Sequence, residues 1–165
     1  DDCPKRRMMV GVYTFKYDGH EHVWHSFIDT WVNMLLDQKK CLVGLEGELG
    51  AGKTYFVRSI LQRAGCKEAV KSPTFSLIET YQLSGQNFSH LDCYRLNSFD
   101  ELQMIGYDPS GEGVSLIEWW SRIIDLEKYL DVSISIDDTN QRQYTIHALT
   151  PVGEHIINRL ADLRF

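Results

Sequence analysis

The sequence predicts an α/β domain of three layers, in which helices cover both faces of a mixed central β-sheet. Three observations predict this class. The apolar run Cys41–Leu45 leads through a glycine-rich loop into a segment with helical periodicity, which is the order of a parallel βα unit. Later segments alternate apolar and polar residues and follow one another through short turns, as antiparallel strands do. The chain has 165 residues, enough for one domain with a substantial core.

The first part of the chain is predicted to supply two strands, each followed by a helix. Val10–Phe15 has the length and composition of a short strand, and Cys41–Leu45 is typical of a buried strand that feeds a loop. Lys53–Ala64 has helical periodicity, and Gly65 is its expected stop signal. His20–Gln38 is predicted to be a helix because its apolar residues form one stripe, at spacings of four, three and four: Trp24, Ile28, Trp31 and Leu35.

The rest of the chain is predicted to alternate between strands and short helices. Phe75–Leu83 and Asn87–Leu91 are expected to form a hairpin through the turn Ser84-Gly85-Gln86. The later strands are expected at Val114–Trp119, Val132–Ile136 and Tyr144–Leu149. Three further helices are expected: one that opens with the capping box of Ser98 and Glu101 and ends at Gly106, one over Ile123–Tyr129, and one that begins at Pro151.

The predicted organisation is a single domain with a short tail. Residues 1–9 are expected to be a flexible tail because Asp1–Arg7 are polar and basic, and residues 10–165 are expected to form one domain without repeats or linkers. No apolar run is long enough to span a bilayer and no signal peptide opens the chain, so we expect no membrane contact and a cytoplasmic location. The net charge of −6 predicts weak or no direct binding to nucleic acid by the protein alone.

The segment Gly47-Glu48-Leu49-Gly50-Ala51-Gly52-Lys53-Thr54 matches the phosphate-binding pattern G-x-x-x-x-G-K-[ST] in full. Glycines allow the backbone to wrap closely enough that successive amides point at a phosphate, and the helix that follows adds its positive end. Lys53 is predicted to bridge the β- and γ-phosphates, and the Thr54 hydroxyl to ligate Mg²⁺. The predicted nucleotide-binding residues are therefore those of this P-loop and the next residue: Gly47, Glu48, Leu49, Gly50, Ala51, Gly52, Lys53, Thr54 and Tyr55. The chain has no N-K-x-D segment for reading guanine, which favours ATP.

A P-loop also needs a carboxylate near Mg²⁺ and a group that orients the attacking water. Asp92 and Glu118 are the two candidates, since each ends a predicted strand, where sites of α/β proteins form. Ser72–Phe75 follows the P-loop helix, where a loop that senses the γ-phosphate would lie. The same segment is equally consistent with a Ser-Pro turn that starts the next strand.

Four segments, GELGAGKT, SPTFSLIETY, HLDCYRL and SLIEWW, occur in this order and closely resemble the bacterial TsaE (YjeE) ATPase family, over about Gly44 to Trp119. The resemblance implies a cytoplasmic ATPase that serves threonylcarbamoyladenosine formation on tRNA together with the partner proteins TsaB and TsaD. It also implies roles for three residues: Thr74 in a switch-like loop, Asp92 in the catalytic set, and Glu118 at the Mg²⁺ site. The chain departs from the family pattern at Tyr55, where a second threonine is frequent, and at Trp120, where proline is frequent.

The sequence thus leads to the hypothesis of an ATPase that transfers the γ-phosphoryl group of ATP–Mg²⁺ to water. The predicted catalytic residues are Lys53, Thr74, Asp92 and Glu118, and the predicted metal ligands are Thr54 and Glu118. We expect slow turnover by the protein alone, because no built-in arginine finger is evident.

Two alternatives stay open at this point. One is a small-molecule kinase, although only Arg122 lies between Asp100 and Arg142, and a kinase lid usually carries several arginines. The other is a non-catalytic interaction module whose partner binding follows nucleotide occupancy.

Overall fold

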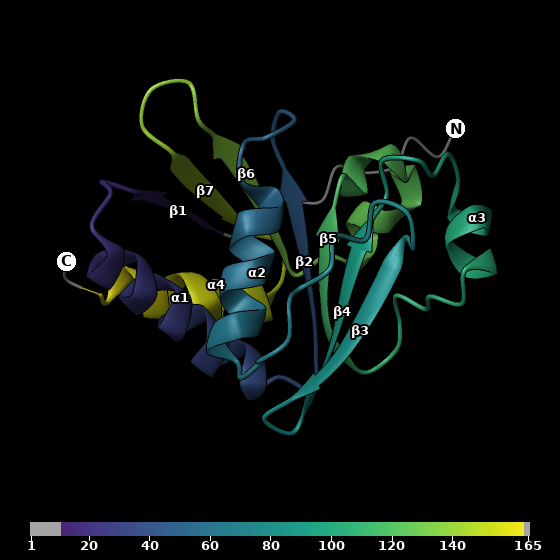
Figure 1. The fold of residues 1–165 in the computed structure, drawn as a ribbon, viewed down its shortest axis with the longest axis horizontal. Helices are drawn as coiled ribbons and strands as arrows, with labels where there is room; N and C mark the ends of the chain where they lie inside the picture. Colours follow the sequence, from purple (N-terminus) through teal and green to yellow (C-terminus); the bar gives the residue numbers. More distant parts are fainter. Residues whose placement is uncertain (1–10, 164–165) are drawn as a thin grey trace.

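A mixed β-sheet runs through the protein, in the strand order β1-β7-β6-β2-β5-β4-β3 (Figure 1). The computed structural model describes residues 11–163, so the expected tail (residues 1–9) and Val10 of the first predicted strand lie outside the described residues. The strands are β1 (Gly11–Lys16), β2 (Lys40–Glu46), β3 (Ile78–Leu83), β4 (Gln86–Asp92), β5 (Gly113–Glu118), β6 (Val132–Asp137) and β7 (Gln143–Ala148). The strands β6, β2, β5 and β4 are parallel to their neighbours among these four, while β7, β1 and β3 pair antiparallel.

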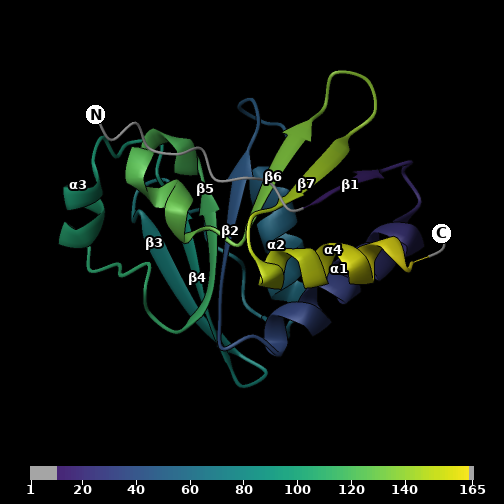
Figure 2. The ribbon, with the colours of Figure 1, turned by 180° about the vertical axis from the view of Figure 1, so that it is seen from behind.

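Helices cover both faces of the sheet, which confirms the predicted three-layer α/β class. One face is covered by α1 (Glu21–Leu36), α2 (Lys53–Arg63) and α4 (Pro151–Ala161), and α1 packs against both of the others. The other face is covered by α3 (Phe99–Met104) and two short 3-10 helices, η1 (Trp120–Arg122) and η2 (Ile124–Tyr129), which follow the end of β5 (Figure 2). No helix within residues 11–163 is both long enough and apolar enough to cross a membrane.

The strand β2 shows how the sequence builds two cores. Cys41, Val43 and Leu45 point into the larger core beneath α1, α2 and α4, whereas Leu42 points into the smaller core on the opposite face. Side chains alternate between the faces of a sheet with a period of two, so a strand buried on both sides must be apolar throughout. This explains the continuous apolar run that precedes the phosphate loop.

The predicted hairpin is present, but its boundaries differ from the prediction. Strand β3 begins at Ile78 rather than Phe75, because residues 73–76 form a turn in which the Leu77 amide donates to the Pro73 carbonyl over 2.8 Å. The connection has two residues, Ser84 and Gly85, both with positive φ, as a tight hairpin of twisted strands requires. Gln86 belongs to β4, where its buried side chain donates to the carbonyl of Leu35 in α1 and to the carbonyl of Gln38, two residues past the end of α1.

The remaining elements agree with the predictions within a few residues. The segment predicted as a short helix over Ile123–Tyr129 is a 3-10 helix that begins at Ile124. Ser98 caps α3 by accepting a hydrogen bond from the Glu101 amide over 3.2 Å. Thr150 caps α4 in the same manner, and Pro151 stands at its first position.

The register of the parallel strands brings the ends of β2, β4 and β5 together at one edge of the sheet. Glu118, the last residue of β5, lies opposite Leu45 of β2 on one side and Asp92 of β4 on the other. All three strands run in the same direction, so their carboxyl ends meet at one edge of the sheet. The glycine-rich loop leaves β2 at this edge, which is where α/β proteins form their ligand sites.

Candidate nucleotide site

The loop between β2 and α2 has a backbone that only glycine accommodates at two of its positions. Gly52 caps α2 with a φ of 118°, in the left-handed region. At Gly47, with a φ of 156°, an added Cβ would lie 2.7 Å from the Ile136 carbonyl oxygen of β6. The glycines of the motif therefore let the loop turn tightly against the neighbouring strand and present the free amides at the start of α2. These amides, at the positive end of the helix, suit an anion.

Lys53 extends back over this loop. Its Nζ donates to the carbonyl oxygens of Gly47 over 2.6 Å and Glu48 over 3.0 Å, and lies 4.1 Å from the centroid of a Trp119 ring. The side chain is buried, and burial lowers its pKa, while the carboxylates of Glu118 and Asp92 act in the opposite direction. A cation is thus fixed at the mouth of the loop, beside the amides that a phosphate would contact.

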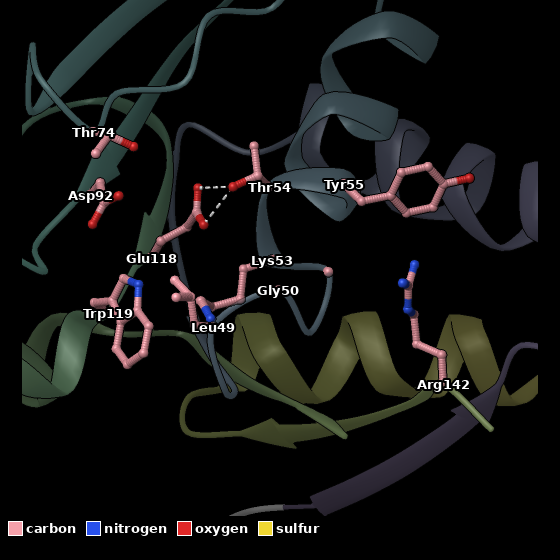
Figure 3. A pocket seen from close by; sticks show the side chains of 11 residues that line it. Leu49, Gly50, Lys53, Thr54, Tyr55, Thr74, Asp92, Glu118, Trp119 and Arg142 are labelled. Carbon is pink, nitrogen blue, oxygen red and sulfur yellow. Dashed lines mark hydrogen bonds between the residues drawn. The ribbon is translucent and has the colours of Figure 1, made fainter. Parts of the chain in front are cut away.

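Thr54 and Glu118 form a pair beside Lys53 (Figure 3). The Thr54 hydroxyl lies 2.9 Å and 3.1 Å from the two carboxylate oxygens of Glu118. A hydroxyl and a carboxylate are hard oxygen donors, which Mg²⁺ prefers, and P-loop proteins combine them with phosphate oxygens and water. These two residues therefore fit the predicted metal site in chemistry and in position.

His90 holds the Glu118 carboxylate from behind, and it was missed from the sequence. Its Nε2 lies 2.6 Å from Oε2 of Glu118, and both side chains are buried. An ionised carboxylate only accepts, so this contact is a hydrogen bond in the histidine tautomer that carries its proton on Nε2. The sequence contained a signal for this residue. His90 stands two residues before Asp92 on β4, and side chains two residues apart on a strand point to the same face of the sheet. A buried partner of this kind fixes the orientation of a metal-ligating group.

Asp92 ends β4 without contacting Thr54. Its Oδ1 accepts a hydrogen bond from the Tyr94 amide over 2.9 Å, and its side chain lines the same cavity as Glu118. Burial raises the pKa of Asp92; the Tyr94 amide lowers it, and the nearby Glu118 carboxylate raises it. The structure thus separates the two acidic candidates. Glu118 is paired with the P-loop hydroxyl, whereas Asp92 faces the cavity, and burial raises its pKa.

Thr74 lies in the turn that precedes β3. Its hydroxyl is 2.8 Å from the Ser72 hydroxyl, and the residue lines the cavity opposite Lys53 and Thr54. Ser72–Phe75 is therefore a turn, and the same turn brings a hydroxyl to the site. The sequence left two alternatives open for Ser72–Phe75, a turn that starts the next strand or a loop at the nucleotide site. The structure is compatible with both at once.

The cavity has a volume of about 480 Å³ and draws on residues from five segments of the chain. It is lined by Leu49, Gly50, Gly52, Lys53, Thr54, Tyr55, Thr74, Asp92, Glu118, Trp119 and Arg142. The other predicted loop residues, Gly47, Glu48 and Ala51, line a hollow on the outer side of the loop, toward residues 136–139. Trp119 lines the cavity, whereas the Trp120 ring packs over Gly44 of β2, within 2.5 Å of where a Cβ would stand.

Arg142 is the second site residue that the sequence did not predict. It immediately precedes β7, lines the cavity, and places its guanidinium carbon 5.4 Å from the centroid of the Tyr55 ring. A single basic residue in a polar loop carries no motif. Only the antiparallel return of β7 beside β6 brings it over the P-loop. Figure 3 shows Arg142 and Tyr55 on one side of Lys53, and Asp92, Thr74 and Trp119 on the other.

A glycine-rich loop between a central parallel strand and a helix, at the carboxyl edge of a mixed sheet, defines the class of P-loop NTPase folds. Comparison with solved structures agrees. The crystal structure of YdiB from Bacillus subtilis superposes with a TM-score of 0.68, covering 93% of this chain and 97% of that one at 24% identity.

Sequence comparison gives the family. The family model for TsaE, the threonylcarbamoyl adenosine biosynthesis protein, matches residues 23–145. The TsaE protein of Haemophilus influenzae is 34% identical over 128 residues, covering 76% of this chain and 81% of that protein. The TsaE protein of Treponema pallidum is 35% identical, covering 71% of this chain and 88% of that protein. The chain belongs to the TsaE family, so the resemblance seen in the four segments is confirmed.

Proposed function

We propose that the protein binds ATP with Mg²⁺ in this cavity and hydrolyses it, and that this hydrolysis supports the formation of threonylcarbamoyladenosine on tRNA. The observation that carries the proposal is the pair formed by Thr54 and Glu118 beside Lys53, 2.9 Å from hydroxyl to carboxylate, with Asp92 and Thr74 facing the same cavity. The names of the relatives, tRNA threonylcarbamoyladenosine biosynthesis proteins, supply the process.

Each residue has a distinct part in the proposed reaction. Lys53 and the loop amides stabilise negative charge on the phosphates, and Thr54 and Glu118 hold Mg²⁺, which supplies further neutralisation of the phosphate oxygens when bound. His90 keeps the Glu118 carboxylate turned toward Thr54. Asp92 or Thr74 orients the attacking water, and the burial that raises the pKa of Asp92 favours it as the group that accepts a proton.

The proposal includes a cytoplasmic setting and two partner proteins, TsaB and TsaD, as the family resemblance implies. Arg142 lies at the opposite end of the cavity from Asp92 (Figure 3). A partner could supply an arginine that stabilises the transferred phosphoryl group, as happens with activated GTPases, and this is the reason for including partner-dependent turnover in the proposal.

The test is phosphate release from ATP by the purified protein, with and without a TsaB–TsaD complex and with and without EDTA. We expect slow release alone, faster release with the complex, and loss of release in EDTA. Lys53→Ala removes the charge at the loop and should abolish release, whereas the exposed Lys67→Ala serves as the matched control and should leave it unchanged. Phosphate release that persists in Lys53→Ala contradicts the assignment. No release with the complex present supports a nucleotide-gated module instead.

A further inference from the structure

We propose that Leu77 is a positioning residue, whose left-handed backbone conformation sets Thr74 and Asp92 beside the cavity. The inference rests on the proposed function, because it concerns the two groups that are proposed to orient the attacking water. Leu77 is not among the residues that line the cavity, so it acts on the reaction through these two.

The backbone of Leu77 has a φ of 69°, in the left-handed region that residues other than glycine disfavour. Within residues 11–163, only Ser84 and Trp119 share a positive φ among the non-glycine residues. Ser84 lies in the two-residue hairpin turn, where positive φ is expected. Leu77 lies outside that turn, and leucine has no polar side chain that could compensate the conformation locally. Such a conformation persists only where surrounding contacts fix it, and residues of this kind gather at functional sites.

Two backbone hydrogen bonds of Leu77 join the turn over residues 73–76 to Asp92. The Leu77 amide donates to the Pro73 carbonyl over 2.8 Å, which closes the turn that carries Thr74. The Leu77 carbonyl accepts from the Asp92 amide over 3.1 Å. The φ and ψ angles of Leu77 set the angle between these two peptide groups, so they determine where the turn lies relative to Asp92. Figure 3 shows the Thr74 and Asp92 side chains together on one side of the cavity.

Further contacts hold this arrangement in place. The half-buried Leu77 side chain packs against the smaller core, and Pro73 is buried. Beyond Asp92, the Cys93 amide donates to the Glu118 carbonyl over 3.0 Å. The end of β4 is thus fixed on two sides, by β5 through Cys93 and by the turn through Leu77.

An extended Leu77 would place the chain differently. The apolar residues Phe75 and Leu77 fit the alternation of a strand, so an extended backbone would continue β3 back toward Phe75. This change would break the hydrogen bond to Pro73 and carry Thr74 out of the turn. In the structure Phe75 is instead 83% exposed. The left-handed conformation of Leu77 therefore diverts the chain into the turn and keeps the Thr74 hydroxyl at the site.

Three substitutions of Leu77 separate its backbone conformation from its packing. Leu77→Asn and Leu77→Gly accept the left-handed region but lose the apolar side chain, whereas Leu77→Val stays apolar and its β-branch disfavours that region. Phosphate release from Mg-ATP with the TsaB–TsaD complex gives kcat and KM. We expect kcat to fall about tenfold in Leu77→Val and less than about threefold in the other two variants. Mg-ADP affinity, measured by calorimetry, should stay within about twofold of wild type in all three, because the P-loop is unchanged.

The matched control is Leu83, a half-buried leucine at the other end of β3 that lacks a positive φ. Leu83→Val should keep the kcat of the wild type. If Leu77 only packs against the smaller core, the order of activities is reversed, and Leu77→Val is the variant closest to wild type. That order overturns the proposal, as does an equal loss of kcat in all three variants or a loss of ADP affinity in Leu77→Val that matches its loss of kcat.

A second measurement reads the same contact without any nucleotide. Hydrogen exchange of the Asp92 amide, followed by NMR, should be about tenfold faster in Leu77→Val than in wild type, because the Leu77 carbonyl is its acceptor. The rate should be nearly unchanged in Leu77→Asn. An unchanged rate in Leu77→Val overturns the positioning role. A wild-type protein that releases no phosphate contradicts the proposed function alone, since the exchange rates still decide whether Leu77 holds Asp92.

Discussion

At the scale of single residues, the site depends on contacts that fix side chains before any ligand arrives. Glu118 receives a hydrogen bond from Thr54 on one side and from His90 on the other, and both partners are close, at 2.9 Å and 2.6 Å. Removing flexibility from a binding group in this way reduces the entropy that is lost when the ligand binds. The carboxylate is therefore held in the orientation that the proposed metal site needs.

Glu118→Gln is expected to leave the fold intact and to weaken the dependence of nucleotide binding and hydrolysis on Mg²⁺. An amide oxygen can still accept from Thr54, but it is a poorer ligand for a hard cation than a carboxylate. Calorimetry should show nucleotide binding with a reduced Mg²⁺ effect. Glu112→Gln, which changes an exposed carboxylate near Lys39, is the control. An unaltered Mg²⁺ response in Glu118→Gln would move the metal-binding role to Asp92.

Thr74→Ala tests whether the turn over residues 73–76 senses the γ-phosphate. The variant loses one hydroxyl at the cavity and should keep nearly the full affinity for ADP, which has no γ-phosphate. It should hydrolyse ATP more slowly in single-turnover measurements and support tRNA modification in a reconstituted system less well still, because ordering by the γ-phosphate couples hydrolysis to loop movement. The exposed Thr80→Ala on β3 is the control. If both activities of Thr74→Ala equal those of the parent, the segment is only a turn.

The residues that could be predicted from the sequence are those that a motif or a strand end marks. Lys53 and Thr54 follow from the loop pattern because the chemistry of phosphate binding restricts both type and spacing. Asp92 and Glu118 follow because carboxylates at strand ends share one edge of a parallel sheet. Arg142 could not be predicted, since its approach to Gly52 depends on how β7 pairs with β6, and that pairing leaves no trace in the residues around it.

At the scale of elements, α1 and α2 are joined by a bidentate ion pair as well as by apolar contacts. Arg63 Nε and Nη2 donate to the two carboxylate oxygens of Asp29, over 2.7 Å and 2.6 Å. This hydrogen bonding from Arg63 lowers the pKa of Asp29. Because the pKa is lower in the folded state than in the unfolded state, the pair stabilises the fold above the ordinary pKa of aspartate, and this stabilisation is lost as the pH falls through the folded-state pKa.

Asp29→Asn is therefore expected to lower the free energy of unfolding at pH 7 by about 0.5 kcal/mol, a value reduced by the solvent exposure of both side chains. The difference from wild type should shrink as the pH is lowered below about 4, where the wild-type carboxylate begins to take up a proton. Urea denaturation at a series of pH values measures both effects. Arg63→Gln in the Asp29→Asn background should cost no more than a few tenths of a kcal/mol further. A difference that grows toward low pH would show that the pair does not stabilise the fold.

The elements themselves were largely predictable, and the misplaced boundaries have local causes. Periodicity located α1 and α2, since each carries one apolar face for the larger core. The start of β3 was wrong by three residues because the apolar residues Phe75 and Leu77 continue the strand pattern, while Leu77 has a φ of 69° that no strand contains. The prediction placed Gln86 in the turn Ser84-Gly85-Gln86. In the fold it belongs to β4, where its buried side chain is satisfied by carbonyls at the end of α1.

At the scale of the whole molecule, the net charge argues against direct binding of tRNA by this protein and favours a role through other proteins. A protein with a net charge of −6 has no long-range attraction for a phosphate backbone. The local cations Lys53 and Arg142 face a cavity of about 480 Å³, which suits a nucleotide rather than a nucleic acid duplex. A role in tRNA modification is therefore expected to act through other proteins that hold the tRNA.

The isolated protein is expected to bind tRNA with a dissociation constant weaker than about 10⁻⁶ M at physiological salt, the tight end of ordinary non-specific binding. Fluorescence anisotropy with labelled tRNA at several salt concentrations measures it. The same titration in the presence of TsaB and TsaD serves as the positive control. A tighter, salt-dependent constant for the protein alone would contradict this expectation and point to a basic surface that the overall charge conceals.

The strand order has a consequence for how the chain folds during its synthesis. Strand β2, which carries the P-loop, pairs only with β5 and β6, and both are synthesised after it. A nascent chain that has reached the β3–β4 hairpin therefore holds an apolar strand, Lys40–Glu46, with no neighbour on either edge. Such an unpaired strand is prone to associate with other chains, and binding it is the task of ribosome-associated chaperones. The first edge of β2 is paired only once β5 emerges, and because β5 ends in Glu118, the same event brings this carboxylate to the carboxyl edge of β2, where the P-loop begins.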